Sequence, residues 1–179
     1  SLLYSFAYDA DGRFSSMSDT NGNVTTVERD AGGHPSGIVG PFGQRTVLTT
    51  NADGYVSAIT TPGGRTTRMS YDANGLLLSV TDPNGNPAVT NVYSSDGLLT
   101  QTTDAGGGSL TYNRALLSDG FETIMTTAMG RTSKVRIVHS VNEDTTEITT
   151  ASDGTVSSTS ILFDGTHRSV AADGTTSSM

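Results

Sequence analysis

The chain has 179 residues, 34% of them hydrophobic, a net charge of −8 and no cysteine. The absence of cysteine excludes a disulfide framework, a cysteine-ligated zinc site and a thiol nucleophile. Only 10 Lys and Arg oppose 18 Asp and Glu, and no basic cluster forms, so we expect no nucleic-acid partner.

Glycine recurs along residues 1–112 with a period of about 21 residues. Two interleaved series carry this period, the first made of Gly12, Gly33, Gly54, Gly75 and Gly97 and the second of Gly22, Gly43, Gly64, Gly85 and Gly107. Turn signals at this spacing leave six or seven residues for each strand, and no segment has the period of a capped helix. The repeat therefore predicts tandem antiparallel β-hairpins with almost no helix.

The best-preserved turns have Asp three residues before the glycine. Such an Asp accepts hydrogen bonds from the backbone two or three residues on, and the following Asn-Gly or Asp-Gly tolerates the left-handed conformation that closes a hairpin. We therefore expect a structural turn motif at Asp9, Gly12, Asp19, Gly22, Asp72, Gly75, Asp82 and Gly85. Most of the negative charge then belongs to turns spread along the chain.

Apolar residues recur two and five positions after the first-series glycines, as in Phe14 with Met17 and Val56 with Ile59. A spacing of three places two residues on opposite faces of a regular strand. Either a β-bulge intervenes, or both faces of the sheet are partly covered. The sequence leaves these two alternatives open.

Residues 113–179 follow the same rhythm more loosely, and we expect a degenerate continuation of the hairpin array. Glycine is replaced by Asn-Glu-Asp at residues 142–144, which is the clearest candidate for a loop that breaks the repeat. Just before it, apolar and polar residues alternate from Val135 to Val141, which predicts a half-buried strand.

Two segments carry a family resemblance. Residues 8–14 read Tyr-Asp-Ala-Asp-Gly-Arg-Phe and are followed by Asp-Thr-Asn-Gly-Asn at 19–23; residues 71–77 and 82–86 repeat this arrangement. They resemble the YD repeat of RHS proteins, of toxin-complex shell subunits and of teneurins. The resemblance covers residues 4–112, with degraded copies at 29–30, 50–51 and 93–94, and extends over 113–179 by rhythm alone.

The resemblance implies an all-β fold in which the hairpins form a curved strip, part of a spiral shell or barrel. In bacterial relatives such shells enclose a toxic C-terminal polypeptide, and in teneurins the shell supports cell-surface adhesion. The self-cleaving aspartyl-protease region of RHS proteins is not recognisable in this chain. Because the sequence begins without Met and inside a repeat, we expect it to be a fragment of a longer chain.

Candidate ligand sites are few. The repeat aromatics Tyr8, Tyr71, Tyr93 and Tyr112 are a possible ligand strip for sugars, and the alternative is cross-strand stacking worth ~0.2–1 kcal/mol per pair. We expect no cofactor; calcium is the one alternative, but Thr20 or Pro83 stands where an EF-hand loop has its closing Glu. The histidines His34, His139 and His167 lie in different repeats without ligand spacing. No residue is nominated as catalytic, and we expect no enzyme.

The sequence thus predicts a structural scaffold or shell segment of a secreted or cell-surface RHS-type protein that encloses or displays another polypeptide. Its expected partners are other repeats of the same polypeptide or further subunits of a large assembly, with a glycan or an enclosed toxin polypeptide as further candidates. A carbohydrate- or protein-binding adhesion module and a self-assembling extracellular coat or filament are the alternatives. No apolar run approaches the ~18–20 residues of a membrane span.

Overall fold

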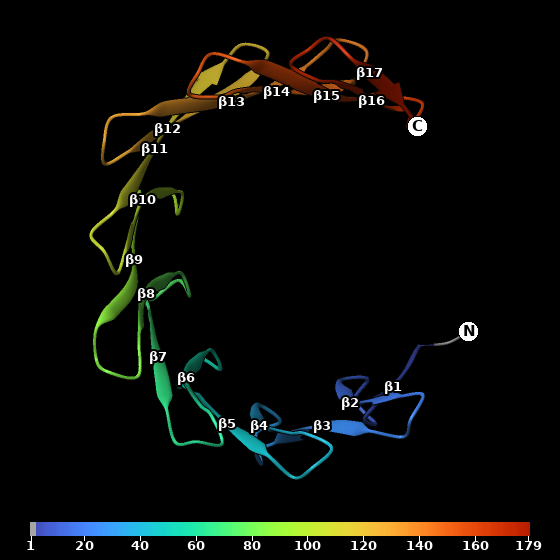
Figure 1. Cartoon of the computed structure of the whole chain (residues 1–179), viewed down its shortest axis with the longest axis vertical. Coiled ribbons are helices and arrows are strands. Elements are labelled where there is room, and N and C mark those ends of the chain that lie inside the picture. The colour runs from blue at the N-terminus through green and yellow to red at the C-terminus, as the bar shows by residue number, and fades with distance from the viewer. Residues whose placement is uncertain (1–2) are drawn as a thin grey trace. The chain divides into compact units, whose positions relative to one another are not determined.

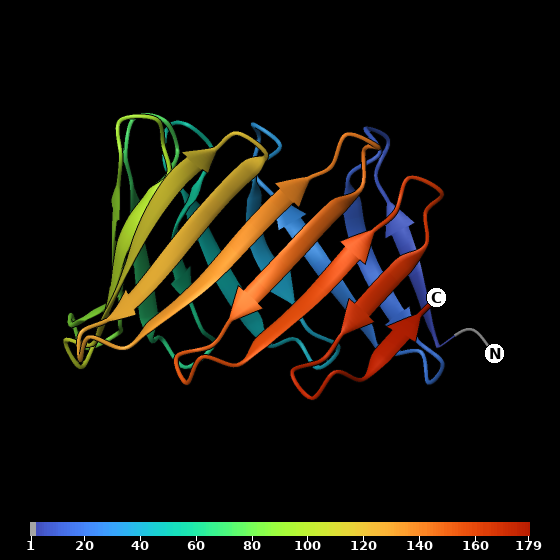
Figure 2. The same cartoon turned by 90° about the horizontal axis from the view of Figure 1, so that it is seen from above.

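The computed structural model describes residues 3–179, which form strands and turns without a helix. One sheet contains 17 strands. Each strand pairs antiparallel with the next one along the chain. Figure 2 shows the strands side by side, with the turns along two rims of the sheet. The predicted all-β array of antiparallel hairpins is confirmed.

The chain divides into two compact units at Thr90 and Asn91, and the ribbon of each unit curves gradually (Figure 1). The strands of unit 1 are β1 (Tyr4–Tyr8), β2 (Phe14–Asp19), β3 (Val24–Arg29), β4 (Pro35–Val39), β5 (Arg45–Thr50), β6 (Val56–Thr60), β7 (Thr66–Tyr71), β8 (Leu77–Thr81) and the first part of β9 (Pro87–Tyr93). Unit 2 contains the end of β9, β10 (Leu99–Asp104), β11 (Ser109–Leu117), β12 (Gly120–Thr127), β13 (Thr132–His139), β14 (Thr145–Thr150), β15 (Val156–Ile161), β16 (His167–Val170) and β17 (Thr176–Ser178). The predicted division at residues 112 and 113 rests on repeat quality and stays a prediction.

We call the turns after odd-numbered strands first-rim turns and those after even-numbered strands second-rim turns. In the first of them, the Gly12 N–H donates to the Asp9 carbonyl at 3.0 Å, and the Asp9 N–H donates to the Arg13 carbonyl at 2.9 Å. Gly12 has a φ of 76°. This is a three-residue hairpin loop whose last residue is left-handed, a conformation that costs a residue with a Cβ about 1–2 kcal/mol. The glycine period therefore sets the turn period.

A β-bulge follows the first-rim turns of unit 1. In β2, Phe14 pairs with Tyr8, and the register then skips Ser15. Tyr8 lies two residues from Phe6, which pairs with Met17, so Phe14 and Met17 share one face. The same irregularity occurs between β3 and β4, β5 and β6, and β7 and β8. The bulge accounts for the apolar spacing of three.

Following the registers across unit 1 places a row of apolar side chains on one face of the sheet. This row contains Phe6, Met17, Val27, Ile38, Leu48, Ile59, Met69, Val80 and Val89. The opposite face carries polar pairs, such as the Thr60 and Thr66 hydroxyls at 2.9 Å and the Glu28–Arg45 ion pair at 2.6 Å. Val24, Val39 and Val47 also lie on this second face. Unit 1 is thus a single-layer sheet with one apolar face and one mainly polar face.

No hydrophobic side chain is fully buried anywhere in residues 3–179. A single layer has no interior, so its strands are held by their neighbours in the sheet and not by a shared core. The described residues also contain no helix with the length and hydropathy needed to cross a membrane.

Unit 2 has longer strands and a different distribution of side chains. Strands β11, β12 and β13 have 9, 8 and 8 residues. Ile137 pairs with Glu147, so the adjacent Ile148 lies on the opposite face, and apolar residues occupy both faces. The predicted strand from Val135 to Val141 is wrong at its end, because β13 ends at His139 and Val141 is a fully exposed turn residue.

Candidate functional site: turns, inter-hairpin contacts and a pocket

The turn aspartates hold the hairpin loops through their carboxylates. Asp9 Oδ1 accepts the N–H of Asp11 at 3.0 Å and the N–H of Arg13 at 2.9 Å. Asp19, Asp72 and Asp82 accept the equivalent two N–H groups of their own turns. Each of these carboxylates therefore satisfies the backbone of one loop.

These hydrogen bonds favour the ionised carboxylates. The Arg13 N–H lowers the pKa of Asp9, the Asn23 side chain lowers the pKa of Asp19, and the Asn86 N–H lowers the pKa of Asp82. The described part of the chain contains no group of three or more His, Asp or Glu residues placed to hold a metal ion. Asp9, Asp19 and Asp82 thus cap the backbone of their own turns, and Asp9 Oδ2 also lies 3.6 Å from Arg29 Nε of the next hairpin.

The residue before the turn Asp connects a hairpin to the preceding one in unit 1. The Tyr71 hydroxyl donates to the Val56 carbonyl at 2.8 Å, and Arg29 Nη2 donates to the Phe14 carbonyl at 3.0 Å. Both acceptors lie 15 residues earlier, at the bulge of the previous hairpin, where the ladder of hydrogen bonds is locally disrupted. Arg29 therefore replaces tyrosine in this contact.

The residue after the turn glycine makes a second connection, to the following first-rim turn. Tyr55 lies over Gly75, so that a Cβ at Gly75 would overlap its hydroxyl group and ring. Tyr55 also stacks on Tyr71, with the ring centroids 5.2 Å apart. Arg13 lies over Gly33 in the same way, and the His34 ring lies less closely over Gly54, 3.2 Å from where a Cβ would stand. These glycines provide space for a neighbouring side chain as well as the left-handed φ.

The four repeat tyrosines have different surroundings. The ring centroids of Tyr8 and Phe14 are 6.2 Å apart, and Tyr8 is 64% exposed. Tyr71, by contrast, is half-buried against Tyr55. Tyr93 is the half-buried last residue of β9, and Tyr112 lies in the middle of β11. In unit 1, Tyr8 in β1 and Tyr71 in β7 are separated by five strands.

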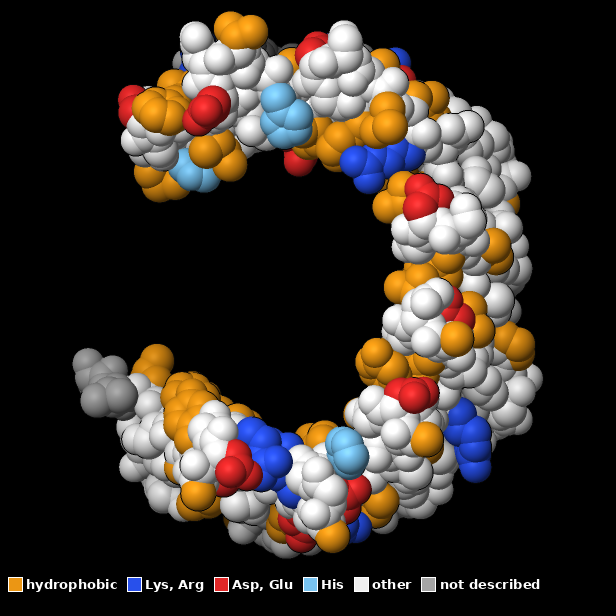
Figure 3. Space-filling view, turned by 180° about the vertical axis from the view of Figure 1, so that it is seen from behind, with side chains coloured by type: hydrophobic (Ala, Val, Ile, Leu, Met, Phe, Trp, Pro, Cys, Tyr) orange, Lys and Arg blue, Asp and Glu red, His pale blue; other side chains and the backbone are white. Residues whose placement is uncertain are grey.

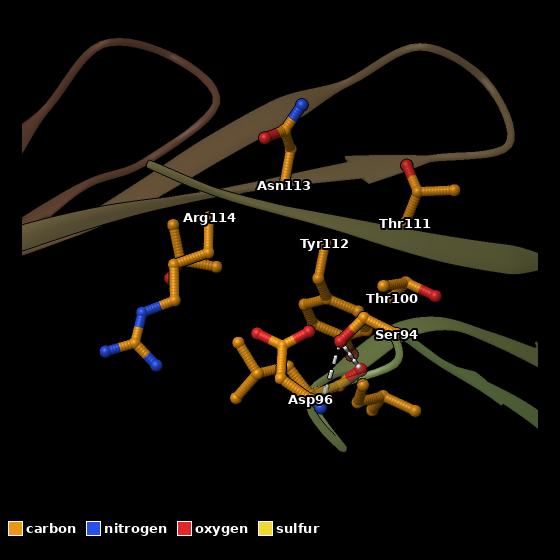
Figure 4. Close-up of a pocket in the computed structure, with 10 residues that line it drawn as sticks. Ser94, Asp96, Thr100, Thr111, Tyr112, Asn113 and Arg114 are labelled. Carbon is orange, nitrogen blue, oxygen red and sulfur yellow. Dashed lines mark hydrogen bonds between the residues drawn. The ribbon is translucent and has the colours of Figure 1, made fainter. Parts of the chain in front are cut away.

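Tyr112 lines a pocket of about 750 Å³ in unit 2, between the turn after β9 and the face of β11. Tyr112 and Arg114 point into this pocket from β11, and Asp96 reaches it from the turn, whereas Asn113 points away (Figure 4). The Ser94 hydroxyl accepts the Leu98 N–H at 3.1 Å and fixes the turn. The pocket combines an aromatic ring with a carboxylate and a guanidinium group, which can bind a small polar ligand.

Sequence reasoning did not find Asp96 or Arg114 as pocket residues. Asp96 occupies an ordinary turn position, and Arg114 comes close to Tyr112 only through the alternation of β11. Arg114 also lies 3.7 Å from the centroid of the Phe121 ring. The only available signal was that Arg114 and Tyr112 are two residues apart and therefore share a face.

The charged side chains are dispersed. Acidic side chains are scattered over the face shown in Figure 3 and do not gather in one patch. His34 Nδ1 lies 3.5 Å from an Asp30 carboxylate oxygen, and His139 Nδ1 lies 3.2 Å from the Thr145 hydroxyl. Each of these histidines has a local partner in its own hairpin.

Single-layer antiparallel hairpins, a fixed turn motif and contacts between successive hairpins define an all-β strip of tandem repeats. The chain matches the teneurin YD-shell family model over residues 1–179. It belongs to this family, which supports a structural role as a shell segment.

The chain is also similar, at low identity, to solved structures of toxin-complex proteins. The crystal structure of TcdB2-TccC3-Cdc42 has 11% identity and a TM-score of 0.42, and the match covers 98% of this chain and 15% of that one. A Photorhabdus luminescens Tc holotoxin pore carrying a TccC3 mutation has 11% identity and a TM-score of 0.36, over 96% of this chain and 17% of that one. The chain thus spans less than a fifth of these relatives. No curated protein matches it.

Proposed function

We propose that the chain is a non-catalytic wall segment of a secreted or cell-surface YD-shell protein that encloses or displays another polypeptide. The observation that carries the proposal is the single-layer sheet without an interior, together with the family match over the whole chain. A wall needs two accessible faces and strong contacts along the strip. The apolar and polar faces of unit 1 and the contacts between its hairpins have these properties.

Protection from protease tests enclosure directly. The full-length protein that contains this segment is digested under native conditions, and its products are compared with those of the same protein unfolded in urea. An enclosed polypeptide should survive the native digestion and be cleaved after unfolding. Equal cleavage rates in both conditions would contradict enclosure.

The self-assembling coat remains the rival structural proposal. Size-exclusion chromatography with light scattering, followed by negative-stain imaging of the purified chain, separates the two. A discrete monomer supports a segment of one larger shell. Rings, tubes or sheets support a coat built by edge pairing of strands.

A second candidate function is carbohydrate binding in the pocket around Tyr112. A sugar can lie on an aromatic ring while its hydroxyl groups bond to charged side chains, and Tyr112, Asp96 and Arg114 supply both kinds of group. NMR titration of the chain with a panel of mono- and disaccharides should shift the Tyr112 and Arg114 signals, and Tyr112→Ala should abolish the effect. Shifts that persist in Tyr112→Ala would exclude this pocket.

A further inference from the structure

Two first-rim turns of unit 2 carry large apolar residues at a position where equivalent turns carry small ones. Val141 and Phe163 are the first residues of three-residue hairpin loops closed by the same backbone hydrogen bonds as the loop after Asp9. At this position the other first-rim turns of the same type carry Ala10, Ala31, Ala52, Ala73 and Ser95. The loop itself therefore does not require a large apolar side chain.

Neither residue contributes to the fold by burial. Val141 is 101% exposed and Phe163 is 76% exposed. A large apolar side chain stabilises a fold when it is removed from water, and these two side chains gain almost none of that stabilisation within the chain. Large apolar side chains that stand in water on adjacent loops indicate a surface covered by another molecule.

The two turns are joined to each other. Asp144 Oδ1 accepts the Phe163 N–H at 2.8 Å, although the residues are 19 positions apart. Asp144 follows the turn residue Glu143, as Tyr55 follows Gly54, so this bond is the unit 2 counterpart of the contact between Tyr55 and Gly75. We call residues 140–144 together with 162–166 the apolar turn pair. Its two tips are held side by side in the free chain, which lowers the entropic cost of binding.

Glu143 occupies the left-handed turn position that glycine fills in the other hairpin loops. It has a φ of 67° and is the only non-glycine residue with positive φ in residues 3–179. The left-handed conformation is less favourable for Glu than for glycine, so the loop retains this side chain at the expense of stability. Sparsely populated backbone conformations of this kind cluster at binding sites.

The charges of the apolar turn pair select the class of partner. Glu143, Asp144 and Asp164 take part in none of the ion pairs found in residues 3–179. An anionic membrane would repel these groups, and a second copy of the chain, with its net charge of −8, offers little positive charge. A protein surface with Lys or Arg beside an apolar depression complements them.

We propose that the apolar turn pair is a protein-recognition surface, with Val141 and Phe163 as apolar anchors and Glu143 as the specificity-determining charge. Its partner is a protein that presents an apolar depression bordered by Lys or Arg. This surface lies on the turns and not on the sheet, and the proposal does not depend on the shell role.

Selection from a phage library of short random peptides tests the proposal. Peptides are selected on the wild-type chain alone, without counter-selection, and are then tested against a Val141→Ala, Phe163→Ala double variant, which carries at both tips the residue of the equivalent turns. Dissociation constants are then measured by fluorescence anisotropy for the wild type, the double variant, Glu143→Gln and Phe42→Ala. Phe42 is 86% exposed on a second-rim turn and is the matched control. Circular dichroism of all variants should be unchanged, since both tips are exposed.

The expected peptides combine large apolar residues with Lys or Arg. The double variant should weaken their binding at least about tenfold, Glu143→Gln should weaken it severalfold and more at low salt, and Phe42→Ala should leave it within about twofold. Peptides that bind the double variant as tightly as the wild type, or that lack cationic residues, would overturn the proposal. So would binding to phosphatidylcholine vesicles or dimerisation in light scattering that the double variant abolishes, because the surface would then serve a membrane or a second copy.

Discussion

Most large apolar residues of unit 1 line up on one face, and only smaller valines lie on the other, whereas in unit 2 neighbouring strands place Ile137 and Ile148 on opposite faces. Unit 1 keeps short strands, a fixed period and a bulge after each first-rim turn. Unit 2 has longer strands between β11 and β13. A strict period therefore preserves the assignment of faces, and a change in strand length lets it drift.

The contacts between hairpins recur at corresponding positions although the residue types differ. In unit 1 the position before the turn Asp is filled by Tyr71 or Arg29, and both donate to a bulge carbonyl 15 residues earlier. The position after the turn glycine is filled by Tyr55 in unit 1, and its counterpart in unit 2 is Asp144, which uses a hydrogen bond instead of a ring contact. The repeat thus specifies where neighbouring hairpins touch and leaves the chemistry of the contact open.

The largest expected effect is at Gly120, where unit 2 departs from the common turn. A Cβ at this position would overlap the carbonyl oxygen of Ile137 in the neighbouring strand β13, and φ is 153°. Gly120→Ala should lower the free energy of unfolding by about 3 kcal/mol, because backbone must move. Urea denaturation followed by circular dichroism measures it. Gly130→Ala, with a φ of 76° and open space around it, should cost about 1–2 kcal/mol. Equal losses in both variants would show that the close approach to β13 is unimportant.

In unit 1 a matched pair of glycines separates turn strain from the contact between hairpins. Gly75 and Gly85 have φ values of 83° and 88°, but Tyr55 lies over Gly75 while Gly85 has open space. Gly75→Ala should destabilise the chain by about 2–3 kcal/mol and Gly85→Ala by about 1–2 kcal/mol. When Gly75→Ala is added to Tyr55→Ala, the further loss in free energy of unfolding should be no larger than that of Gly85→Ala. If Gly75→Ala and Gly85→Ala behave alike, Tyr55 is not a structural contact of this turn.

The sequence contains most of the fold and little of the site. The glycine period predicts the hairpins, because left-handed turn positions exclude most other residues. The sequence does not decide on the bulge, because the spacing of Phe14 and Met17 fits two arrangements until the partner strand is known. The alternating pattern predicts a strand through Val141, and nothing in that pattern marks Ser140 as a turn residue. Asp96 and Arg114 converge only after β10 and β11 have paired, which no local signal contains.

The tyrosine contact offers a smaller and more specific test of unit 1 against unit 2. Tyr71→Phe removes the donor to the Val56 carbonyl and should cost about 1 kcal/mol in free energy of unfolding. Tyr112→Phe removes a hydroxyl that makes no hydrogen bond within residues 3–179, and its effect should be within about 0.5 kcal/mol. Both are measured by urea denaturation. If Tyr112→Phe costs as much free energy of unfolding as Tyr71→Phe, the loss at Tyr71 cannot be assigned to its hydrogen bond with the Val56 carbonyl.

The smallest expected effect is common to both units and comes from the turn aspartates. Backbone N–H groups lower the pKa of Asp30 and Asp82 in unit 1, and of Asp153 and Asp173 in unit 2, below the ordinary value of 3.8. The folded state therefore binds fewer protons than the unfolded state near this pH, so the contribution to stability is complete above it and is lost as the pH falls through the lowered values. Urea titrations followed by NMR signals of both units should give constant unfolding midpoints from pH 7 to about pH 5 and lower midpoints below about pH 4. Asp30 and Asp82 accept two backbone N–H groups from the first turn position, whereas Asp153 and Asp173 accept one from the position before the glycine. Because both arrangements favour the ionised carboxylate, the midpoints of the two units should fall over the same pH range. A decline confined to unit 1, or a rise in acid, would mean that the capped turns do not control stability in this range.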